Sequence, residues 1–296
     1  MSQNRSAFPP RISIGMPVHN GADRLADALD SLLAQTEKNL EIIISDNAST
    51  DATPDICRAY AGKDSRIRVI RQRQLIPAIA NFIFVRDQAR APYFMWAAHD
   101  DTRSPDYAGR LADALDADPK AILAFGDVIH YSDGKAERIV LDFASAGRTT
   151  ADRLRRTANS QLHHIYGLWR LEVLRSIPWL QSAWWSDSPF MMAASVCGDF
   201  IYVPGVEFHY LDNQRWFLSW PRRPGLLGVL EQPGRLLRRI GQLFSLIPCA
   251  IRCVGRVAGP WAGFLAGIFA AEKIVRQIRT FFTRRLHAWW AARKAG

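Results

Sequence analysis

The sequence predicts an α/β protein built around a mostly parallel β-sheet that is flanked by helices. Short apolar runs alternate along the chain with longer segments in which apolar residues recur every three or four positions. The first pattern is typical of buried strands and the second of amphipathic helices. Three of the apolar runs are followed by polar clusters. Because 48% of the 296 residues are hydrophobic, the chain can bury a sizeable core.

Strands and helices can be assigned in chain order from these patterns. The first strand is expected at Arg11–Val18 (RISIGMPV), and a helix with apolar residues from Leu25 to Leu33 follows it. Alternation of this kind implies right-handed βαβ units, which produce a parallel sheet. The further expected elements are strands at Leu40–Ser45, Ile67–Ile70, Tyr93–Ala97 and Ala121–Phe125, and helices around Ile56–Tyr60, at Asn81–Ala89 and at Pro105–Ala117.

The polar clusters mark the expected site. They are His19-Asn20, Asp46-Asn47 and His99-Asp100-Asp101, and each follows an expected strand. In open α/β sheets, ligands bind at the carboxyl ends of the strands. The three clusters lie far apart in sequence, but this fold would bring them to one edge of the sheet.

The adjacent carboxylates of Asp100 and Asp101 are poorly explained by packing. Burying them costs several kcal/mol unless a cation or hydrogen-bond donors compensate. A divalent metal that holds a diphosphate is a natural compensator, since Mg²⁺ and Mn²⁺ favour oxygen ligands. The alternative is a solvated loop or a helix cap before Pro105.

Four motifs occur in order within the first 130 residues: Ile14–Asn20 (IGMPVHN), Leu29–Thr36 (LDSLLAQT), Glu41–Asp51 (EIIISDNASTD) and Tyr93–Asp101 (YFMWAAHDD). With these motifs, the first 130 residues resemble the family 2 glycosyltransferases, which adopt the GT-A fold. The resemblance implies inverting transfer of a sugar from a UDP-, GDP- or dTDP-linked donor, with Mn²⁺ or Mg²⁺ as cofactor. It also implies a glycan or lipid-linked acceptor, as in the synthesis of cell-surface polysaccharide or glycolipid.

The resemblance also suggests roles for individual residues. Asp46 would accept a hydrogen bond from the base, although it could instead be a plain helix cap. Asp100 would lie near the ribose, and Asp101 would bind the metal. The other nucleotide-binding candidates are Pro17, Val18, His19, Asn20 and Asn47.

One loop departs from the family pattern. Many relatives carry glycine before the helix at Asn81, where this chain has Ile76-Pro77-Ala78. Proline fixes φ and has no N–H to donate, which argues against phosphate contacts by this loop.

Inverting transfer needs a general base, which in this family is an Asp or Glu at the start of a helix in the acceptor half. Asp187 fits, because it follows Trp184-Trp185-Ser186 and precedes an apolar stretch at Phe190–Val196. The alternatives are that Asp187 only caps this helix, or that Asp199, which resembles a turn residue after Gly198, is the base. His209 is a further candidate metal ligand, with a structural role as the alternative.

The excess positive charge lies at the C-terminal end. The chain carries 38 Lys and Arg and 28 Asp and Glu, and residues 225–296 hold 12 of the bases but only two of the acids. Residues 272–294 also plot as an amphipathic helix, with Ile274 on its apolar face and Lys273 on its basic face. Other apolar-face residues are Ile278, Phe281, Phe282 and Trp289, and other basic ones are Arg276, Arg279, Arg284 and Lys294.

A basic helix of this kind favours an anionic membrane surface. Packing on the catalytic domain is the alternative, and nucleic acid is disfavoured because no binding motif for it is present. The N-terminus lacks the apolar stretch of a signal peptide, which predicts a cytoplasmic protein attached peripherally to the inner face of the membrane. The longest apolar run, near Val257–Ala271, falls short of the roughly 20 residues that span a bilayer.

These observations predict two regions. Residues 1–224 would form the GT-A domain, with a donor half at about 10–130 and an acceptor half at about 131–224, and residues 225–296 a basic helical membrane-associated segment. The expected function is that of a metal-dependent glycosyltransferase. The alternative is a catalytically silent module of the same fold that docks to a membrane assembly. A nucleotidyltransferase is less well supported, because the first strand ends in Pro17-Val18-His19-Asn20 rather than in a glycine-rich basic loop.

Overall fold

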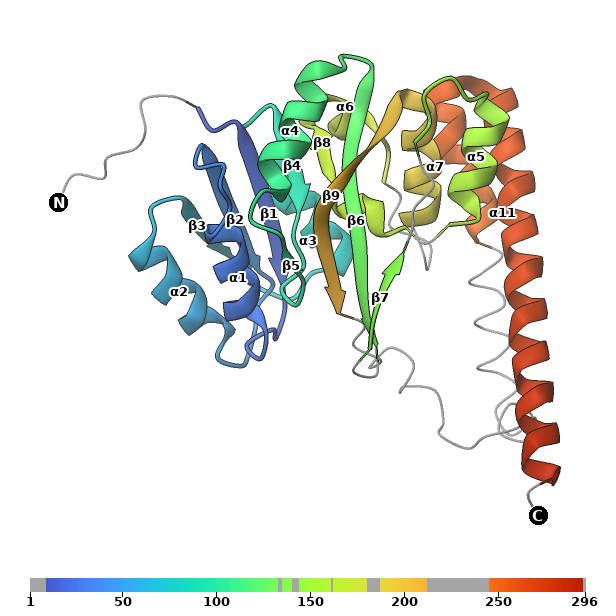
Figure 1. Cartoon of the computed structure of the whole chain (residues 1–296), viewed down its shortest axis with the longest axis horizontal. Helices are drawn as coiled ribbons and strands as arrows, with labels where there is room; N and C mark the ends of the chain where they lie inside the picture. The colour runs from blue at the N-terminus through green and yellow to red at the C-terminus, as the bar shows by residue number, and fades with distance from the viewer. Residues whose placement is uncertain are drawn as a thin grey trace. The chain divides into compact units, whose positions relative to one another are not determined.

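A computed structural model describes residues 9–132, 135–139, 144–160, 162–179, 187–211 and 245–294, with side chains up to Arg276 in the last helix (Figure 1). The chain forms two compact units. The first unit comprises residues 1–147, 161–177 and 197–212, and the second comprises 148–160, 178–196 and 213–296. The second unit thus includes two segments from the region expected to form the acceptor half, together with the C-terminal helix.

A mixed sheet forms the centre of the first unit, with nine strands among the described residues. Its order is β3-β2-β1-β4-β8-β6-β9-β5, with β7 paired to β6. The strands are β1 (Ile12–Val18), β2 (Leu40–Asp46), β3 (Ile67–Arg71), β4 (Tyr93–Trp96), β5 (Thr102–Arg103), β6 (Ala121–Ser132), β7 (Lys135–Ile139), β8 (Leu168–Arg170) and β9 (Asp199–Leu211).

The strands β1 to β4 form the parallel part that the sequence predicts. β1 lies between β2 and β4 and is parallel to both, and β3 is parallel to β2. The next strand in the order, β8, is antiparallel to β4 and to β6, while β6 and β9 run parallel to each other. The sheet is therefore more mixed than expected. β6 is also longer than the predicted Ala121–Phe125, because its polar second half pairs with β9 and β7.

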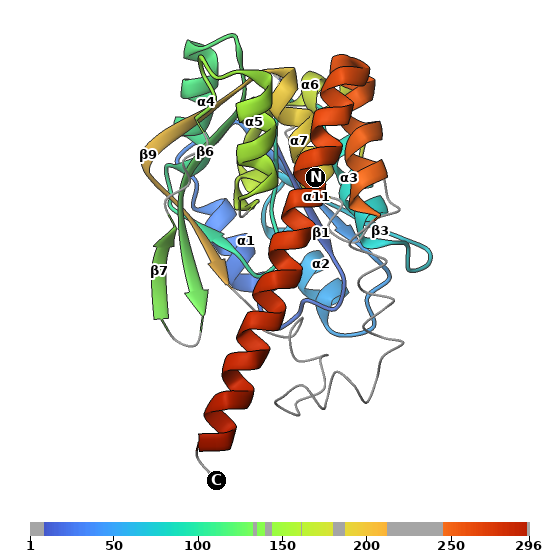
Figure 2. The same cartoon turned by 90° about the vertical axis from the view of Figure 1, so that its right-hand side faces the viewer.

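Helices flank this sheet (Figures 1 and 2). The helix α1 buries the apolar face that its sequence predicts, with Leu25, Ala28, Leu29 and Leu32 all inside. The described helices of the first unit are α1 (Leu25–Leu33), α2 (Thr53–Lys63), α3 (Ala78–Asp87), α4 (Tyr107–Ala117), the short 3₁₀ helix η1 (His163–Tyr166) and α6 (Leu171–Ser176).

Close packing between β1 and its neighbours requires a glycine. A Cβ atom placed on Gly15 would lie 2.6 Å from Cζ of Phe94, which is fully buried, and 3.1 Å from Cγ1 of Val85. Cores are packed at crystal density, so this contact leaves no room for a side chain at position 15. Gly15 therefore lets α3 and β4 approach the central strand.

The helix α3 begins at Ala78, three residues before the predicted start. Its N-cap is Pro77, whose φ of −52° suits proline and whose ψ of 141° is extended. The side chain of Asn81 is 2% exposed and fixes the helix to β2. Its Oδ1 accepts from Ser45 Oγ at 2.6 Å, and its Nδ2 donates to the Ser45 carbonyl at 3.1 Å. This pairing holds the start of α3 beside the end of β2.

Asp199 is not the turn residue that its sequence context predicts. It is the first residue of β9, and its backbone N–H donates to the Lys120 carbonyl at 3.0 Å. The prediction was wrong because Gly198 is read locally as a turn, whereas the segment after it pairs with β6, which is remote in sequence. Strand pairing of this kind is fixed by tertiary context.

The described part of the second unit is helical. It consists of α5 (Thr150–Ala158), α7 (Asp187–Cys197) and α11 (Leu246–Lys294). Within α11, Gly259 has the left-handed φ of 85°, and Pro260 follows it. This break divides α11 into two arms that lie side by side (Figures 1 and 2). A Cβ on Gly263 would lie 2.7 Å from the Ile251 carbonyl oxygen, so glycine permits close contact of the arms.

The orientation of the second arm differs from the helical plot. Lys273 was expected on the basic, solvated face, yet it is 8% exposed. The helical plot was wrong at this residue because it contains hydropathy alone, and here the arm packs with other helices of its unit. Ile274, expected on the apolar face, is 0% exposed, which fits the alternative that this helix packs against protein. The apolar residues that this arm exposes are instead Trp261, Phe264, Ile268 and Val275. The predicted residues from 278 onward lie outside the described side chains.

One described helix, Leu246–Arg276, is long and apolar enough by composition to cross a membrane. Its apolar window has a mean hydropathy of 1.3. Core helices of globular proteins meet the same test, so length and composition alone do not define a span.

Candidate active site

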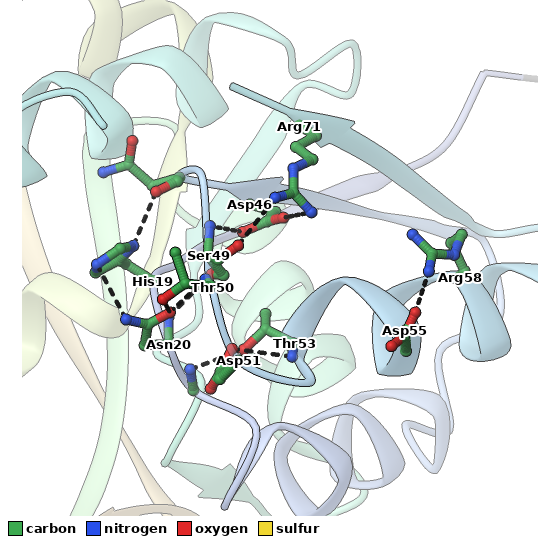
Figure 3. A network of polar contacts seen from close by, with 12 residues as sticks. His19, Asn20, Asp46, Ser49, Thr50, Asp51, Thr53, Asp55, Arg58 and Arg71 are labelled. Carbon is green, nitrogen blue, oxygen red and sulfur yellow. Dashed lines mark hydrogen bonds and ion pairs between the residues drawn. The ribbon is translucent and has the colours of Figure 1, made fainter. Parts of the chain in front are cut away.

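The ends of β1 and β2 are joined by a network of polar contacts (Figure 3). His19 Nδ1 lies 2.8 Å from the Asn47 carbonyl oxygen. The backbone N–H of Asn20 donates to Ser49 Oγ at 2.9 Å, and Asn20 Oδ1 accepts from the Thr50 N–H at 2.8 Å. Two of the predicted polar clusters therefore lie together at the carboxyl ends of adjacent parallel strands.

Two residues in this network have left-handed backbone conformations. Asn20 has a φ of 51° and Ala48 a φ of 54°. A positive φ is uncommon outside glycine, and for alanine it costs about 1 kcal/mol. The hydrogen bonds at Asn20 and Ser49 hold the turns in place. Strained turns of this type cluster at binding sites, where the surrounding structure fixes them.

Asp46 lies at the end of β2 and is 1% exposed. Its Oδ1 accepts from the Ser49 N–H at 3.0 Å, and its Oδ2 lies 3.4 Å from Arg71 Nη1. Oδ2 is buried and has no hydrogen-bond partner. An oxygen that is ion-paired with an arginine but accepts no hydrogen bond is suited to accept one from a ligand such as a nucleotide base.

Asn47 forms a paired contact with the next loop. Its Oδ1 accepts from the Ile76 N–H at 3.0 Å, and its Nδ2 donates to the Ile76 carbonyl at 2.8 Å. Both ends of the amide are thus used to position the loop before α3. The arrangement makes Asn47 a residue that shapes the site, although the sequence suggested direct contact with a nucleotide.

The third cluster meets the first through His99. A Cβ on Gly21 would lie 2.3 Å from Cδ2 of His99, so this ring packs directly on the backbone that follows His19-Asn20. His99 Nδ1 lies 4.0 Å from Asp100 Oδ1, and the Asp100 side chain is 20% exposed. The loops after β1, β2 and β4 therefore converge, as the sequence predicts for one edge of the sheet.

Asp101 is held at the end of β9. Its side chain is 1% exposed, and its Oδ1 accepts from the Leu211 N–H at 3.1 Å. Burial, reinforced by the negative charge of Asp100, raises the pKa of Asp101 to about 7, while the positive charge of Arg103 opposes the shift. Oδ2 is buried without a hydrogen-bond partner.

A divalent cation fits the unsatisfied oxygen of Asp101. Carboxylate oxygen is the ligand type that Mg²⁺ and Mn²⁺ prefer, and Mg²⁺ sites often use one or two carboxylates together with substrate phosphates. No group of three His, Cys, Asp or Glu side chains suited to a metal occurs in the described part of the chain. The residues present thus fit a cation that completes its coordination on a diphosphate, and not a site made by protein alone.

His209 lies on β9 opposite Thr102 of β5. Its Nδ1 is 3.1 Å from the Tyr131 hydroxyl, and its Nε2 is 3.3 Å from Glu207 Oε2. Both ring nitrogens therefore have protein partners, and a ligand role would require one of these contacts to break. This geometry fits the structural alternative better than the metal ligand that the sequence suggested.

Pro17 and Val18 lie within β1 and are buried, opposite Ser45 and Asp46 of β2. Their side chains belong to the core, so a ligand would meet mainly the backbone at the end of this strand. His19 and Asn20, the next two residues, are exposed. The change from buried to exposed side chains marks the edge where a base could stack on His19.

Sequence reasoning missed two arginines of this site. Arg71 ends β3, where its Nη2 donates to the Ser49 carbonyl at 2.9 Å beside Asp46 (Figure 3). Arg103 is 4% exposed and its guanidinium lies 4.9 Å from the ring centre of Phe208. Its Nη2 donates to the Trp96 carbonyl at 2.8 Å. A signal was present for Arg103, because a cation two residues after paired carboxylates is a common way to compensate them.

Asp187 lies in the second unit as the first residue of α7. Its Oδ1 accepts from the Ser188 N–H at 3.0 Å. Burial raises the pKa of this carboxyl, and the positive charge of Lys273 partly offsets the rise. A carboxylate at a helix N-terminus with a raised pKa has the properties of a general base, as well as those of the helix cap.

Comparison with known families identifies the class of protein. Residues 13–175 match the model of Glycosyl transferase family 2, which is more than half of the chain. The chain therefore belongs to the family 2 glycosyltransferases, and the resemblance noted from its motifs is confirmed.

Relatives match over about a third of the chain. An uncharacterised glycosyltransferase of Rickettsia typhi is 35% identical over 106 residues, which are 36% of this chain and 31% of that protein. The putative glycosyltransferase EpsH of Bacillus subtilis is 36% identical over 103 residues, which are 34% of this chain and 29% of that protein. The likeness to these relatives thus spans less than a third of their own length.

Solved structures support the fold over nearly the whole chain. The S. aureus TarS fragment 1–349 in complex with UDP-GlcNAc has a TM-score of 0.61 and 13% identity, and the match covers 90% of this chain and 92% of that one. The mannosyltransferase PcManGT from Pyrobaculum calidifontis, in complex with GDP-Man and Mn²⁺, has a TM-score of 0.57 and 18% identity over 97% and 87% of the two chains. At these identities the likeness shows the fold, and the expected GT-A fold is confirmed.

Proposed function

We propose that this protein is an inverting, metal-dependent glycosyltransferase that moves a hexose from a nucleotide sugar to a hydroxyl of a saccharide or lipid-linked glycan. The observation that carries the proposal is the convergence of Asp46, His19-Asn20 and Asp100-Asp101 at one edge of the sheet of a family 2 chain. Buried carboxyl oxygens of Asp46 and Asp101 lack hydrogen-bond partners there. A donor with a base, a diphosphate and its cation would satisfy both.

The donor would bind with its base against His19 and Asp46 and its diphosphate toward Asp101. A UDP, GDP or dTDP group fits this scheme equally well, because each offers an N–H to a carboxylate. The cation would be Mg²⁺ or Mn²⁺ held by Asp101, and its chemistry is to neutralise charge on the leaving diphosphate. Asp100 would lie beside the ribose.

Asp187 would act as the general base. In the transfer, the acceptor oxygen forms a bond to the anomeric carbon while the bond from that carbon to the diphosphate breaks. The proton of the acceptor hydroxyl passes to the Asp187 carboxylate, and the nucleoside diphosphate leaves with the electron pair. Attack from the face opposite the leaving group inverts the anomeric configuration, as in other single-displacement sugar chemistry.

Ligand-dependent thermal stability tests the donor site. A ligand that binds only the native state raises the unfolding temperature by mass action. We expect one class of nucleotide sugar to stabilise the full chain in the presence of Mn²⁺ or Mg²⁺, and Asp101→Ala to lose this effect. Asp127→Ala is the matched control, since Asp127 is a buried carboxylate of the same unit that pairs with Arg138. Absence of stabilisation in well-folded wild-type protein would favour the silent-module alternative.

The exposed apolar face of α11 supports a second part of the proposal, attachment to an anionic membrane from the cytoplasmic side. Trp261, Phe264 and Ile268 are 70%, 53% and 40% exposed and recur at helical spacing. Arg252 and Arg256 of the first arm are exposed as well. Aromatic and apolar residues combined with Arg suit the interface of an anionic bilayer, where each cation adds about 1 kcal/mol.

Co-sedimentation with lipid vesicles tests this attachment. We expect binding to phosphatidylglycerol vesicles at low salt, weaker binding at high salt, and little binding to phosphatidylcholine alone. Trp261→Ser combined with Phe264→Ser should reduce binding at least tenfold, because each side chain contributes about 1.5–3 kcal/mol when buried. Leu75→Ser, which removes a 60% exposed apolar residue of the first unit, is the control. Equal binding of all variants would refute the assignment of this face.

A further inference from the structure

The C-terminal helix brings a buried lysine to the start of α7. Lys273 is 8% exposed, and its Nζ donates to Ser188 Oγ at 3.1 Å. Burying an ammonium group costs several kcal/mol unless opposite charge or hydrogen bonds compensate. The same helix has exposed positions close by, at Glu272 and Arg276, where a lysine would cost nothing. The burial of Lys273 therefore calls for an explanation at the residues that it faces.

Asp187 precedes Ser188, the residue that Lys273 contacts. Ser188, which accepts from Lys273, also donates its N–H to Asp187 Oδ1 at 3.0 Å, so one residue contacts both charged groups. Burial lowers the pKa of Lys273 and raises that of Asp187, and the charge of each group opposes the shift of the other. The two groups therefore stabilise each other in their charged forms.

The other described charged groups around α7 do not share this position. Arg153 of α5 reaches the far end of α7, where its Nη1 lies 3.4 Å from the Ser195 carbonyl oxygen. Glu272 and Arg276, which flank Lys273 on α11, are exposed. Among these groups, the positive charge that acts on Asp187 is that of Lys273.

We infer that Lys273 is a positioning residue for the candidate base, and that the C-terminal helix thereby supplies a group that keeps Asp187 ionised and fixes the start of α7. The inference rests on the proposed role of Asp187. It assigns to the C-terminal helix a part in the sugar transfer in addition to any contact with lipid. A general base works only in its ionised form, so a neighbouring cation sets the pH range in which Asp187 can accept a proton.

Direct titration of Asp187 tests the inference without using enzyme activity. Full-length protein labelled with [4-¹³C]aspartate would be titrated by NMR, and Asp187→Asn would identify the signal. We expect Lys273→Met to raise the midpoint of Asp187 by about one pH unit or more, which is the usual effect of losing an adjacent opposite charge. Lys273→Arg keeps the charge and should leave the midpoint near its original value. An unchanged midpoint in Lys273→Met would overturn the inference.

Turnover gives the second readout. Release of nucleoside diphosphate from the stabilising donor, with water as the acceptor, would be followed between pH 5 and pH 10. For Lys273→Met we expect the acidic limb of the kcat–pH profile to move to higher pH together with the midpoint of Asp187. At pH values below both midpoints, kcat should then fall about tenfold for every pH unit by which the midpoint rises, and it should recover at pH values above them. KM for the donor should not change. A uniform loss at every pH would indicate a merely structural lysine and would also overturn the inference.

The outcomes separate this inference from the proposed function. If the midpoint of Asp187 moves in Lys273→Met but Asp187→Asn retains full turnover, the assignment of the base fails and the pairing of the two residues stands. If Lys273→Met does not fold, the double variant with Asp187→Asn should fold, because it leaves no unpaired buried charge. A double variant that is no more stable than Lys273→Met would contradict the pairing.

Discussion

The two units hold their candidate reactive groups in different ways. In the first unit, Asn20, Ser49 and Asp46 are fixed by hydrogen bonds between loops that directly follow neighbouring parallel strands. In the second unit, Asp187 shares a neighbour with Lys273, which is separated from Ser188 by 85 positions in the chain. The first arrangement follows from the order of the parallel strands, whereas the second depends on the C-terminal helix α11.

This difference indicates that donor binding and proton acceptance, the two functions proposed for these units, can vary separately. The proposed donor site lies at the ends of strands whose register is set by the sheet, so its geometry tolerates little change. The surroundings of Asp187 are set by helix packing, and a different C-terminal helix would change them without affecting the sheet. Substitutions in the two units should therefore affect different measurements.

We expect Asp187→Asn to give the largest difference between a measurement that depends on the second unit and one that depends on the first. It removes the candidate base, which typically contributes 10²- to 10⁴-fold, so donor turnover should fall by roughly that factor. Thermal stabilisation by nucleotide and metal should be unchanged, because the donor residues belong to the first unit. Asp199→Asn, the alternative base, should retain turnover. Loss of nucleotide stabilisation in Asp187→Asn would show that the two units are not separable.

The next largest effect concerns the stability of the first unit. Gly15→Val would force a side chain into the 2.6 Å space before Phe94. We expect the free energy of unfolding to fall by about 1–3 kcal/mol, as for other overpacked cores, measured by urea denaturation. Gly62→Ala is the control, since nothing lies within 4 Å of its added Cβ and alanine favours the helix. Similar losses in both variants would mean that the packing around Gly15 is not tight.

A smaller effect is expected from pH. Burial lowers the pKa of His163 to about 4, so folding favours the neutral ring. The contribution of the neutral His163 ring to the free energy of unfolding is fully present above the ordinary pKa of about 6.5 and is lost as the pH falls toward 4. After allowance for partial exposure, this loss is roughly 1–2 kcal/mol. His163→Phe should flatten this part of the stability curve between pH 7 and pH 4. An equal slope in the variant would assign the acid sensitivity to other groups.

The smallest effect is expected at Pro77, where this chain departs from the glycine of many relatives. The φ of −52° suits proline, so Pro77→Ala should cost only about 0.4–1 kcal/mol, through the greater freedom of the unfolded chain. Nucleotide stabilisation should not change if this loop makes no phosphate contact. A gain in nucleotide affinity for Pro77→Gly would instead show that the proline restricts the donor site.

The parts of the fold that the sequence predicts are those with local signals. β1, β2 and β4 are short, mostly apolar stretches that are buried throughout, as expected for parallel strands that are covered on both faces. β3 (IRVIR) is only partly buried, and its β-branched residues indicated a strand. β9 was missed, because Pro204 and Gly205 in its sequence DFIYVPGVEFHYL are typical of a turn and divide the strand into two short stretches. The helix α5 was missed as well, since the sequence TADRLRRTA buries only Leu154, Thr157 and Ala158.

The same reasoning applies to the candidate site. The convergence of Asp46, Asp101 and their neighbours at one edge of the sheet could be predicted because each was expected to follow a strand, and the rule that strand ends meet needs no knowledge of side-chain contacts. The roles of Asn47 and His209 depend on partners at Ile76, Tyr131 and Glu207, which no local pattern indicates. Lys273 was assigned to a solvated face, because a helical plot does not contain the other helices of the unit.

The break at Gly259 also sets the length of the first arm of α11. Without it, the 49 residues of α11 would form a rod of about 70 Å, since each residue adds about 1.5 Å. With it, the first arm from Leu246 is about 20 Å long and lies along the second arm as far as Gly267, which Ile247 and Ile251 cover. Lys273 comes one and a half turns later, beyond the reach of the first arm. The length of the first arm thus determines how much of the second arm it covers. A first arm two turns longer would cover the stretch of helix from which Lys273 reaches Ser188.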